Sequence, residues 1–130
     1  MRNSYKLAAL VIAAAALAGC ATQPIMNVDA APVVAPAGKA VTRDQVRAAI
    51  MRAGVALGWQ IKDEGANMLV GTLQLRTHTA VVEIPYSAST YSIKYRSSVD
   101  LNESGGNIHK NYNGWITNLN RGINAQLAIL

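Results

Sequence analysis

The chain has 130 residues, a formal net charge of +5 and one cysteine, which leaves room for one small domain. Without residues 1–19, which include Arg2 and Lys6, ten basic and seven acidic side chains remain, or about +3. This charge is too small and too scattered for nucleic-acid binding, and with Cys20 as the only cysteine an internal disulfide is excluded.

The first 20 residues have the layout of a secretory signal. Residues 1–6 are short and basic, residues 7–18 are twelve consecutive apolar residues, and Gly19-Cys20 follows. A positive segment, an apolar segment and a small-residue processing site are typical of a signal peptide. A membrane-spanning helix needs roughly 20 apolar residues, so we predict a cleaved signal over residues 1–19.

The end of this signal, Leu17-Ala18-Gly19-Cys20, resembles the lipobox of bacterial lipoproteins. The resemblance implies that the chain is cut before Cys20, that the cysteine sulphur is lipidated and that the new amino terminus is acylated. Cys20 would then anchor the protein to a membrane, with no thiol left for catalysis or metal binding. Ala21, where aspartate commonly marks inner-membrane retention, implies the outer membrane with the domain facing the periplasm. The alternative is a buried free cysteine after an ordinary signal.

Residues 20–40 are predicted to be the lipidated cysteine and a flexible tether. Pro24, Pro32 and Pro36 stand among Ala, Val and Thr without helical or strand periodicity. As a coil, such a segment has ends about 25 Å apart. We place the folded domain at residues 41–130.

A helix is predicted to begin after Thr42. Thr42-Arg43-Asp44-Gln45 fits a capping box, and an apolar stripe at helical spacing follows, made of Val46, Ile50, Ala53 and Leu57. Gly58 is placed to end the helix. The arginines at 43, 47 and 52 lie off the stripe and are interpreted as a solvated face.

From residue 59 the pattern alternates and predicts four antiparallel strands, over 59–64, 68–76, 79–86 and 91–98. A two-residue turn at 77–78 places Leu73 opposite Val82. A four-residue turn at 87–90 places Val82 opposite Tyr95 and Glu83 opposite Lys94. These registers put one apolar set on a single buried face: Trp59, Ile61, Leu69, Leu73, Leu75, Val82, Ile84, Tyr86, Tyr91, Ile93 and Tyr95.

The opposite sheet face is predicted to be uncovered and polar, with Thr72, Gln74, Arg76, Glu83, Lys94 and Arg96. Charges on this face can simply protect a sheet edge. The functional hypothesis is that Arg76, Lys94 and Arg96 form a shallow cationic surface for an anionic envelope component or an acidic protein. The planar guanidinium group pairs bidentately with phosphate and carboxylate.

Residues 100–110 are predicted to form a loop, and residues 111–130 an amphipathic helix. Many asparagines and two glycines give this helix poor intrinsic propensity. It must therefore depend on burial of its apolar face, with Trp115 as the largest anchor.

Two stretches, Gly106 to Leu119 and Tyr91 to Tyr95, resemble a group of small proteobacterial envelope lipoproteins and secreted proteins whose function is not established. The likeness covers roughly residues 58–124. It implies one shared domain and brings no catalytic residues with it.

Chemistry-bearing groups are few. His78 and His109 have no further ligand at metal spacing, so we predict no metal and no cofactor. A hydrolase triad could be composed from Ser97, Asp100 and His109, but any chain of this size offers such a set of residues.

Together, the patterns predict an α+β protein with two layers, in the order α-β-β-β-β-α, in which both helices cover one face of a four-stranded antiparallel meander. The predicted function is a non-enzymatic, lipid-anchored binding or structural module of the cell envelope. The alternative is a small hydrolase acting on an envelope polymer.

Overall fold

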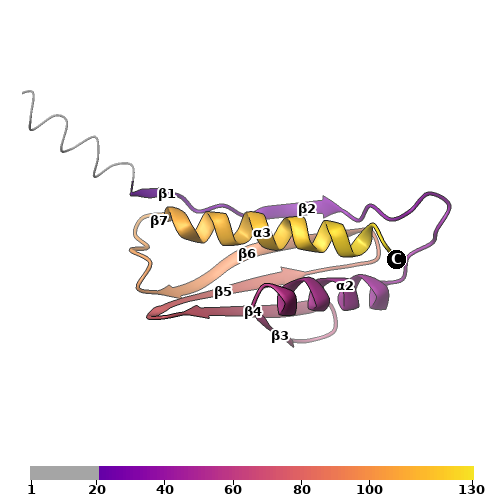
Figure 1. Cartoon of the computed structure of the whole chain (residues 1–130), viewed down its shortest axis with the longest axis horizontal. Helices are drawn as coiled ribbons and strands as arrows, with labels where there is room; N and C mark the ends of the chain where they lie inside the picture. Colours follow the sequence, from indigo (N-terminus) through magenta and orange to yellow (C-terminus); the bar gives the residue numbers. More distant parts are fainter. Residues whose placement is uncertain (1–20) are drawn as a thin grey trace, which may run out of the picture.

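The structure, a computed structural model, describes residues 21–130 (Figure 1). The predicted signal and Cys20 lie outside the described residues. The elements in chain order are β1 (Thr22–Pro24), β2 (Val28–Pro32), α2 (Arg43–Ala56), β3 (Gln60–Asp63), β4 (Met68–Leu75), β5 (His78–Pro85), β6 (Thr90–Val99), β7 (Asn107–His109) and α3 (Lys110–Leu127).

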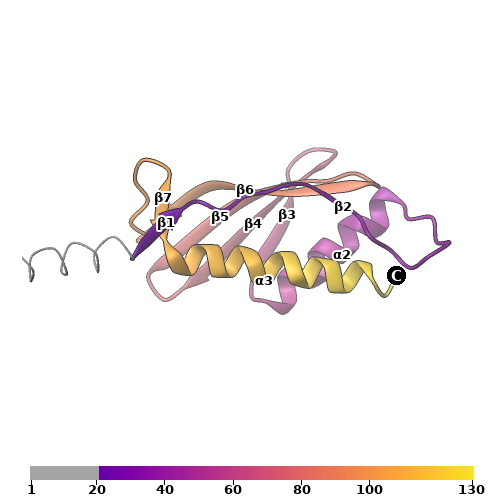
Figure 2. The ribbon, with the colours of Figure 1, turned by 90° about the horizontal axis from the view of Figure 1, so that it is seen from above.

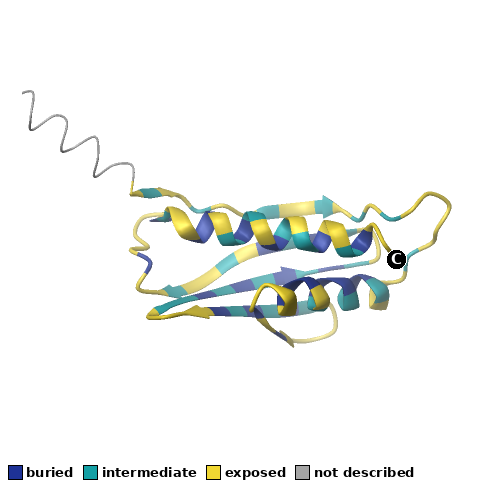
Figure 3. Cartoon of the chain, viewed as in Figure 1, coloured by how far each residue is buried: buried dark blue, intermediate teal, exposed yellow. Residues whose placement is uncertain are grey.

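One antiparallel sheet, in the order β2-β6-β5-β4-β3, forms the first layer, and β1 pairs with β7 in a small second sheet. Both helices lie on the same side of the large sheet (Figure 2), and their inward faces carry the buried residues (Figure 3). The predicted α+β class and the two helices on one face are confirmed. The prediction of four strands is wrong, because the sheet has a fifth strand, β2.

The fifth strand comes from the segment predicted to be a flexible tether. In place of a coil over residues 21–40, β1 pairs with β7 and β2 pairs with the edge of β6. Side-chain amides fasten the chain between and beside these strands. Asn113 accepts from the Met26 amide and donates to the Pro24 carbonyl, both at 2.9 Å, and Asn27 accepts from the Tyr95 amide at 2.9 Å. Residues 22–32 are therefore part of the domain.

Helix α2 begins and ends as its sequence predicts. The Thr42 hydroxyl accepts from the Gln45 amide at 3.2 Å, and the Gln45 side chain accepts from the Thr42 amide at 2.9 Å. Gly58 follows the helix with φ +86°, the left-handed conformation that favours glycine. Val46, Ile50 and Ala53 are buried, whereas Leu57 remains 42% exposed.

Helix α2 packs closely against the first strand of the meander at Gly54. A Cβ added there would lie 2.6 Å from Ile61 Cγ1 and 2.7 Å from Ile61 Cδ1. Such distances are far below the normal separation of carbon atoms. Only glycine allows the helix and β3 to approach this closely.

The strand registers are right in part. Val82 lies opposite Tyr95 and Glu83 opposite Lys94, as predicted. Between β4 and β5 the predicted register is wrong by two residues, since Leu73 pairs with Ala80 and the turn falls at Arg76-Thr77. A shift of two keeps every side chain on its predicted face, but it leaves Leu75 at the end of the sheet and 45% exposed.

Helix α3 presents Tyr112, Ile116, Leu119, Ile123 and Leu127 to the core, all fully buried. The prediction that Trp115 is its main anchor is wrong, because that side chain is only partly buried at the margin of the core. Tyr112 takes this role. Its ring meets that of Tyr95 edge to face, with centroids 5.6 Å apart. Within residues 21–130, no helix is long and apolar enough to cross a membrane.

Candidate functional site

The uncovered face of the large sheet carries the residues predicted to bind a partner. Lys94 and Arg96 belong to β6, and Arg76 follows β4 in the hairpin turn to β5. All three side chains are exposed. Arg96 differs from the other two, because its guanidinium group already pairs with Glu64 and Glu83.

Arg96 is the centre of an ion-pair network on this face. It stands at a β-bulge, since Val82 pairs with Tyr95 and Val81 with Ser97. Its Nε donates to Glu83 at 3.0 Å, and its two terminal nitrogens form a bidentate pair with Glu64, one contact measuring 2.8 Å. The hydrogen bond from Arg96 lowers the pKa of Glu64 below its ordinary value. Arg96 therefore ties β6 and β5 to the end of β3.

Arg76 lies beside a shallow depression on the same face. Gly58, Gln60, Thr72 and Gln74 line it together with Arg76, and its volume is about 330 Å³. The guanidinium group thus stands among amide and hydroxyl groups. Arg76 has φ +56°, a left-handed conformation that is uncommon for a residue with a side chain. These donors and acceptors suit an anionic or hydroxyl-rich group.

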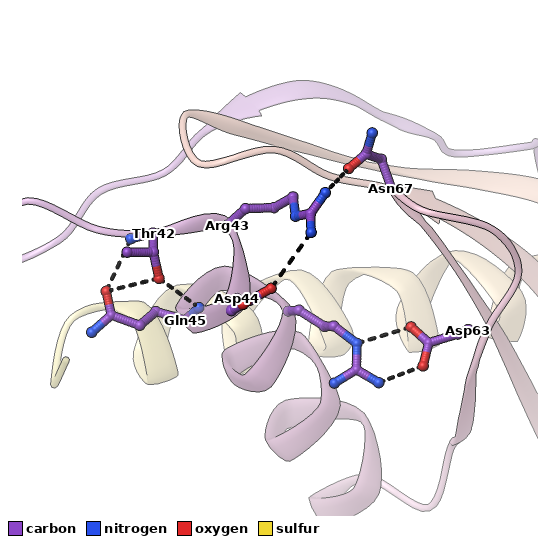
Figure 4. Close-up of polar contacts among 7 residues, drawn as sticks. Thr42, Arg43, Asp44, Gln45, Asp63 and Asn67 are labelled. Carbon is purple, nitrogen blue, oxygen red and sulfur yellow. Dashed lines mark hydrogen bonds and ion pairs between the residues drawn. The ribbon is translucent and has the colours of Figure 1, made fainter.

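The arginines of α2 reach solvent, with Arg43 and Arg52 exposed as predicted, and each also bonds a neighbouring element. Figure 4 shows the contacts on the Arg43 side of the helix. Arg47 forms a bidentate pair with Asp63 of β3 at 2.8 and 2.5 Å, and Arg43 donates to Asn67 at 2.8 Å. Arg52 donates to Gln126 of α3 at 3.0 Å. The hydrogen bond from Arg47 lowers the pKa of Asp63. Each arginine fastens α2 to a neighbouring element.

Within residues 21–130, no hydrogen bond joins the side chains of the three residues considered as a hydrolase triad, Ser97, Asp100 and His109. The Asp100 carboxylate accepts from the Thr77 hydroxyl at 2.6 Å, and its carbonyl oxygen lies 2.7 Å from His78 Nδ1. His109 caps α3, where its Nδ1 accepts from the Asn111 amide at 3.1 Å. Asp100 and His109 therefore have separate local roles. Residues 21–130 contain no group of three or more His, Cys, Asp or Glu residues placed to hold a metal ion.

The amino-terminal end of the domain is fixed in place. The Lys110 amide donates to the Ala21 carbonyl at 3.4 Å, and Thr22 pairs with His109. Asn113 supports the same region and is the one buried polar residue of the described chain, 9% exposed. The sequence analysis did not single out Asn113 among the asparagines of this helix. Its only signal is a position next to Tyr112 on the buried side of the helical repeat.

Comparison with known proteins adds no relative: no protein-family model, curated protein or solved structure matches this chain. The resemblance to small envelope lipoproteins stays a prediction.

Proposed function

We propose that the chain is a lipid-anchored envelope protein, held in the outer membrane through acylated Cys20, and that its folded domain is a non-catalytic binding or structural module facing the periplasm. The observation that carries this proposal is the Leu17-Ala18-Gly19-Cys20 ending behind a basic and an apolar segment. The fold is compatible with it, because Thr22, two positions after Cys20, is already paired in β1.

Membrane fractionation tests the anchor. A single acyl chain gives marginal membrane binding and several give stable anchoring, so Cys20→Ser should release the protein into the periplasm or leave an uncut precursor. Ala21→Asp is the matched variant, because it keeps the cysteine and should move the protein to the inner membrane. A Cys20→Ser protein that fractionates with outer membranes at the wild-type level would refute the anchor.

For the binding module, we propose that the uncovered sheet face receives an anionic envelope component or an acidic protein. Arg76 and Lys94 are its cationic groups, and Arg96 supports the face through its glutamate pairs. The depression beside Arg76 supports this choice, since it combines a guanidinium group with amides and a hydroxyl.

Sedimentation with lipopolysaccharide or peptidoglycan fragments tests this surface at low and high salt. Reversal of Arg76 and Lys94 to glutamate should abolish salt-sensitive association and leave the melting temperature nearly unchanged, since exposed charges contribute little to stability. Reversal of Lys39 and Arg121, which are exposed outside the sheet, is the control with equal charge change. Equal binding by both double variants would refute the surface.

A further inference from the structure

Only Ala21 separates the first strand of the folded domain from Cys20, the proposed anchor. Ala21 is hydrogen-bonded to Lys110, and Thr22 is already paired in β1. One trans peptide bond joins Ala21 to Cys20, which sets their Cα atoms about 3.8 Å apart. Whatever membrane holds Cys20 must therefore approach the surface of the domain around β1.

Three segments share that end of the molecule with β1 (Figures 1 and 2). The β4–β5 turn at Arg76-Thr77 lies at the start of β5, and β6 ends beside it because Val99 pairs with Thr79. The loop of residues 100–106 then leads into β7, which pairs with β1. We call this surface the β1 end. It is formed by β1, β7, the 100–106 loop and the β4–β5 turn, together with the adjoining ends of β4, β6 and α3 at Leu75, Val99 and Lys110.

We propose that the β1 end lies directly against phospholipid headgroups, so that the sheet and α3 extend away from the bilayer. This inference rests on the proposed acylation of Cys20. The chemistry of the β1 end fits a headgroup layer: Leu75 and Val99 are 45% and 60% exposed, and Lys110 is an exposed cation. Such groups gain from contact with the membrane interface and with lipid phosphates.

The acidic groups of the β1 end are Asp100 and Glu103. Asp100 accepts a hydrogen bond from Thr77 and lies 3.6 Å from His78 Nδ1. Glu103 is exposed in the loop. The short covalent link then orients the domain, and the lipid contacts assist it.

With the β1 end against the bilayer, the other end of the domain lies at a distance from the bilayer that the length of the domain sets. Helix α3 has 18 residues and is therefore about 27 Å long. The turn at residues 86–89 lies at the far end of β5 from the β1 end, and would stand away from the bilayer by a comparable distance. The uncovered sheet face would then stand roughly upright and remain open to a partner from the side.

Fluorescence quenching on vesicles tests this orientation. The protein, produced from the whole chain with its signal and purified from the producing cells, is reconstituted in phosphatidylethanolamine–phosphatidylglycerol vesicles that contain headgroup spin-labelled lipid. Two variants each carry one labelled cysteine at an exposed position, Ser104→Cys at the β1 end or Ala88→Cys at the opposite end. Because about 27 Å separates the ends, we expect the probe at position 104 to be quenched roughly three-fold more.

A spacer variant isolates the role of the short link. Ten Gly and Ser residues inserted between Cys20 and Ala21 form a coil with ends about 18 Å apart, which should largely remove the difference between the two probes. Equal quenching in the original chain, or an undiminished difference in the spacer variant, would overturn the orientation. Failure of the protein to bind vesicles at all would instead overturn the proposed acylation, so the two failures are distinguishable.

Discussion

Replacement of Gly54 by alanine is the sharpest test of how α2 packs on the sheet. The added methyl group would lie 2.6 Å from Ile61 Cγ1, an atom in the middle of a buried side chain. Inserting a methyl into a packed core costs typically about 1–3 kcal/mol. Removal of glycine from a helix returns at most about 1 kcal/mol. We expect a net loss of about 1–2 kcal/mol in the free energy of unfolding.

Gly114 of α3 is the matched control. A Cβ at Gly114 meets nothing within 4 Å, so Gly114→Ala brings the helical gain without a clash and should stabilise the domain by about 0.5–1 kcal/mol. Urea unfolding of residues 21–130 gives both values, provided the slope with denaturant is unchanged. In thermal melts the two variants should differ by roughly 6–12 °C, at about 4 °C per kcal/mol.

The direction in which each variant changes the free energy of unfolding tests the packing of its helix. A Gly54→Ala protein as stable as the wild type would mean that Ile61 moves aside without loss, and that the close approach of α2 and β3 does not require glycine. A destabilised Gly114→Ala protein would contradict the exposed placement of that helix face.

Three further outcomes follow from individual contacts. Asn113→Ala should lower the free energy of unfolding by about 1–3 kcal/mol, because it removes the two hydrogen bonds to the Met26 amide and the Pro24 carbonyl, each typically contributing about 0.5–1.5 kcal/mol. Asn118→Ala, at an exposed position, should not. Equal melting temperatures for the two variants would refute the role of Asn113 in holding the first strands. Arg96→Glu should destabilise the domain far more than Lys94→Glu, because it places a third carboxylate beside Glu64 and Glu83. In the wild type, the ion pairs of Arg96 should weaken as the pH falls through the lowered pKa of Glu64. Tyr112→Phe should be neutral or stabilising, because the buried hydroxyl has no hydrogen-bond partner within residues 21–130. Burial raises the pKa of Tyr112, so the wild type should lose stability above about pH 10. In thermal melts at alkaline pH, this loss should be steeper for the wild type than for the variant.

The meander could be predicted because its information is local. The four-residue turn before β6 fixes the register that sets Glu83 opposite Lys94. The turn before β5 was misplaced because Arg76 adopts a positive φ, and nothing in its residue type indicates this. Alternation still assigned the faces correctly, since faces depend only on parity.

The strands β1 and β2 could not be predicted in the same way. Pro24 and Pro32 are typical of coil, yet proline also occurs on edge strands, where its missing N–H is not needed. Each proline stands at the end of such a strand. The groups that hold this segment, Asn113 and Ser92 among them, come from residues 62 to 89 positions further along the chain. Single-sequence patterns carry no information on contacts of that range.

For the candidate surface, the sequence predicted which face of the sheet its residues occupy, but not which other side chains they contact. Lys94 and Arg96 are exposed and alternate in β6 with the buried Ile93 and the half-buried Tyr95, and Arg76 is exposed in the β4–β5 turn. The sequence could not indicate that Glu64, which follows β3, reaches Arg96, because that contact depends on how the strands twist past one another.

The pairing of the first strand with the last has a consequence for the order of folding. Thr22 meets His109, and the Met26 amide bonds to Asn113, 87 residues away. Contacts of such long sequence separation form late, because a large loop must close first. During synthesis, residues 28–32 have no strand partner until β6 has been made, and residues 22–24 have none until β7 follows. The segment next to the predicted signal therefore stays extended while the rest of the protein emerges, which is the state in which a polypeptide can be threaded through a narrow channel.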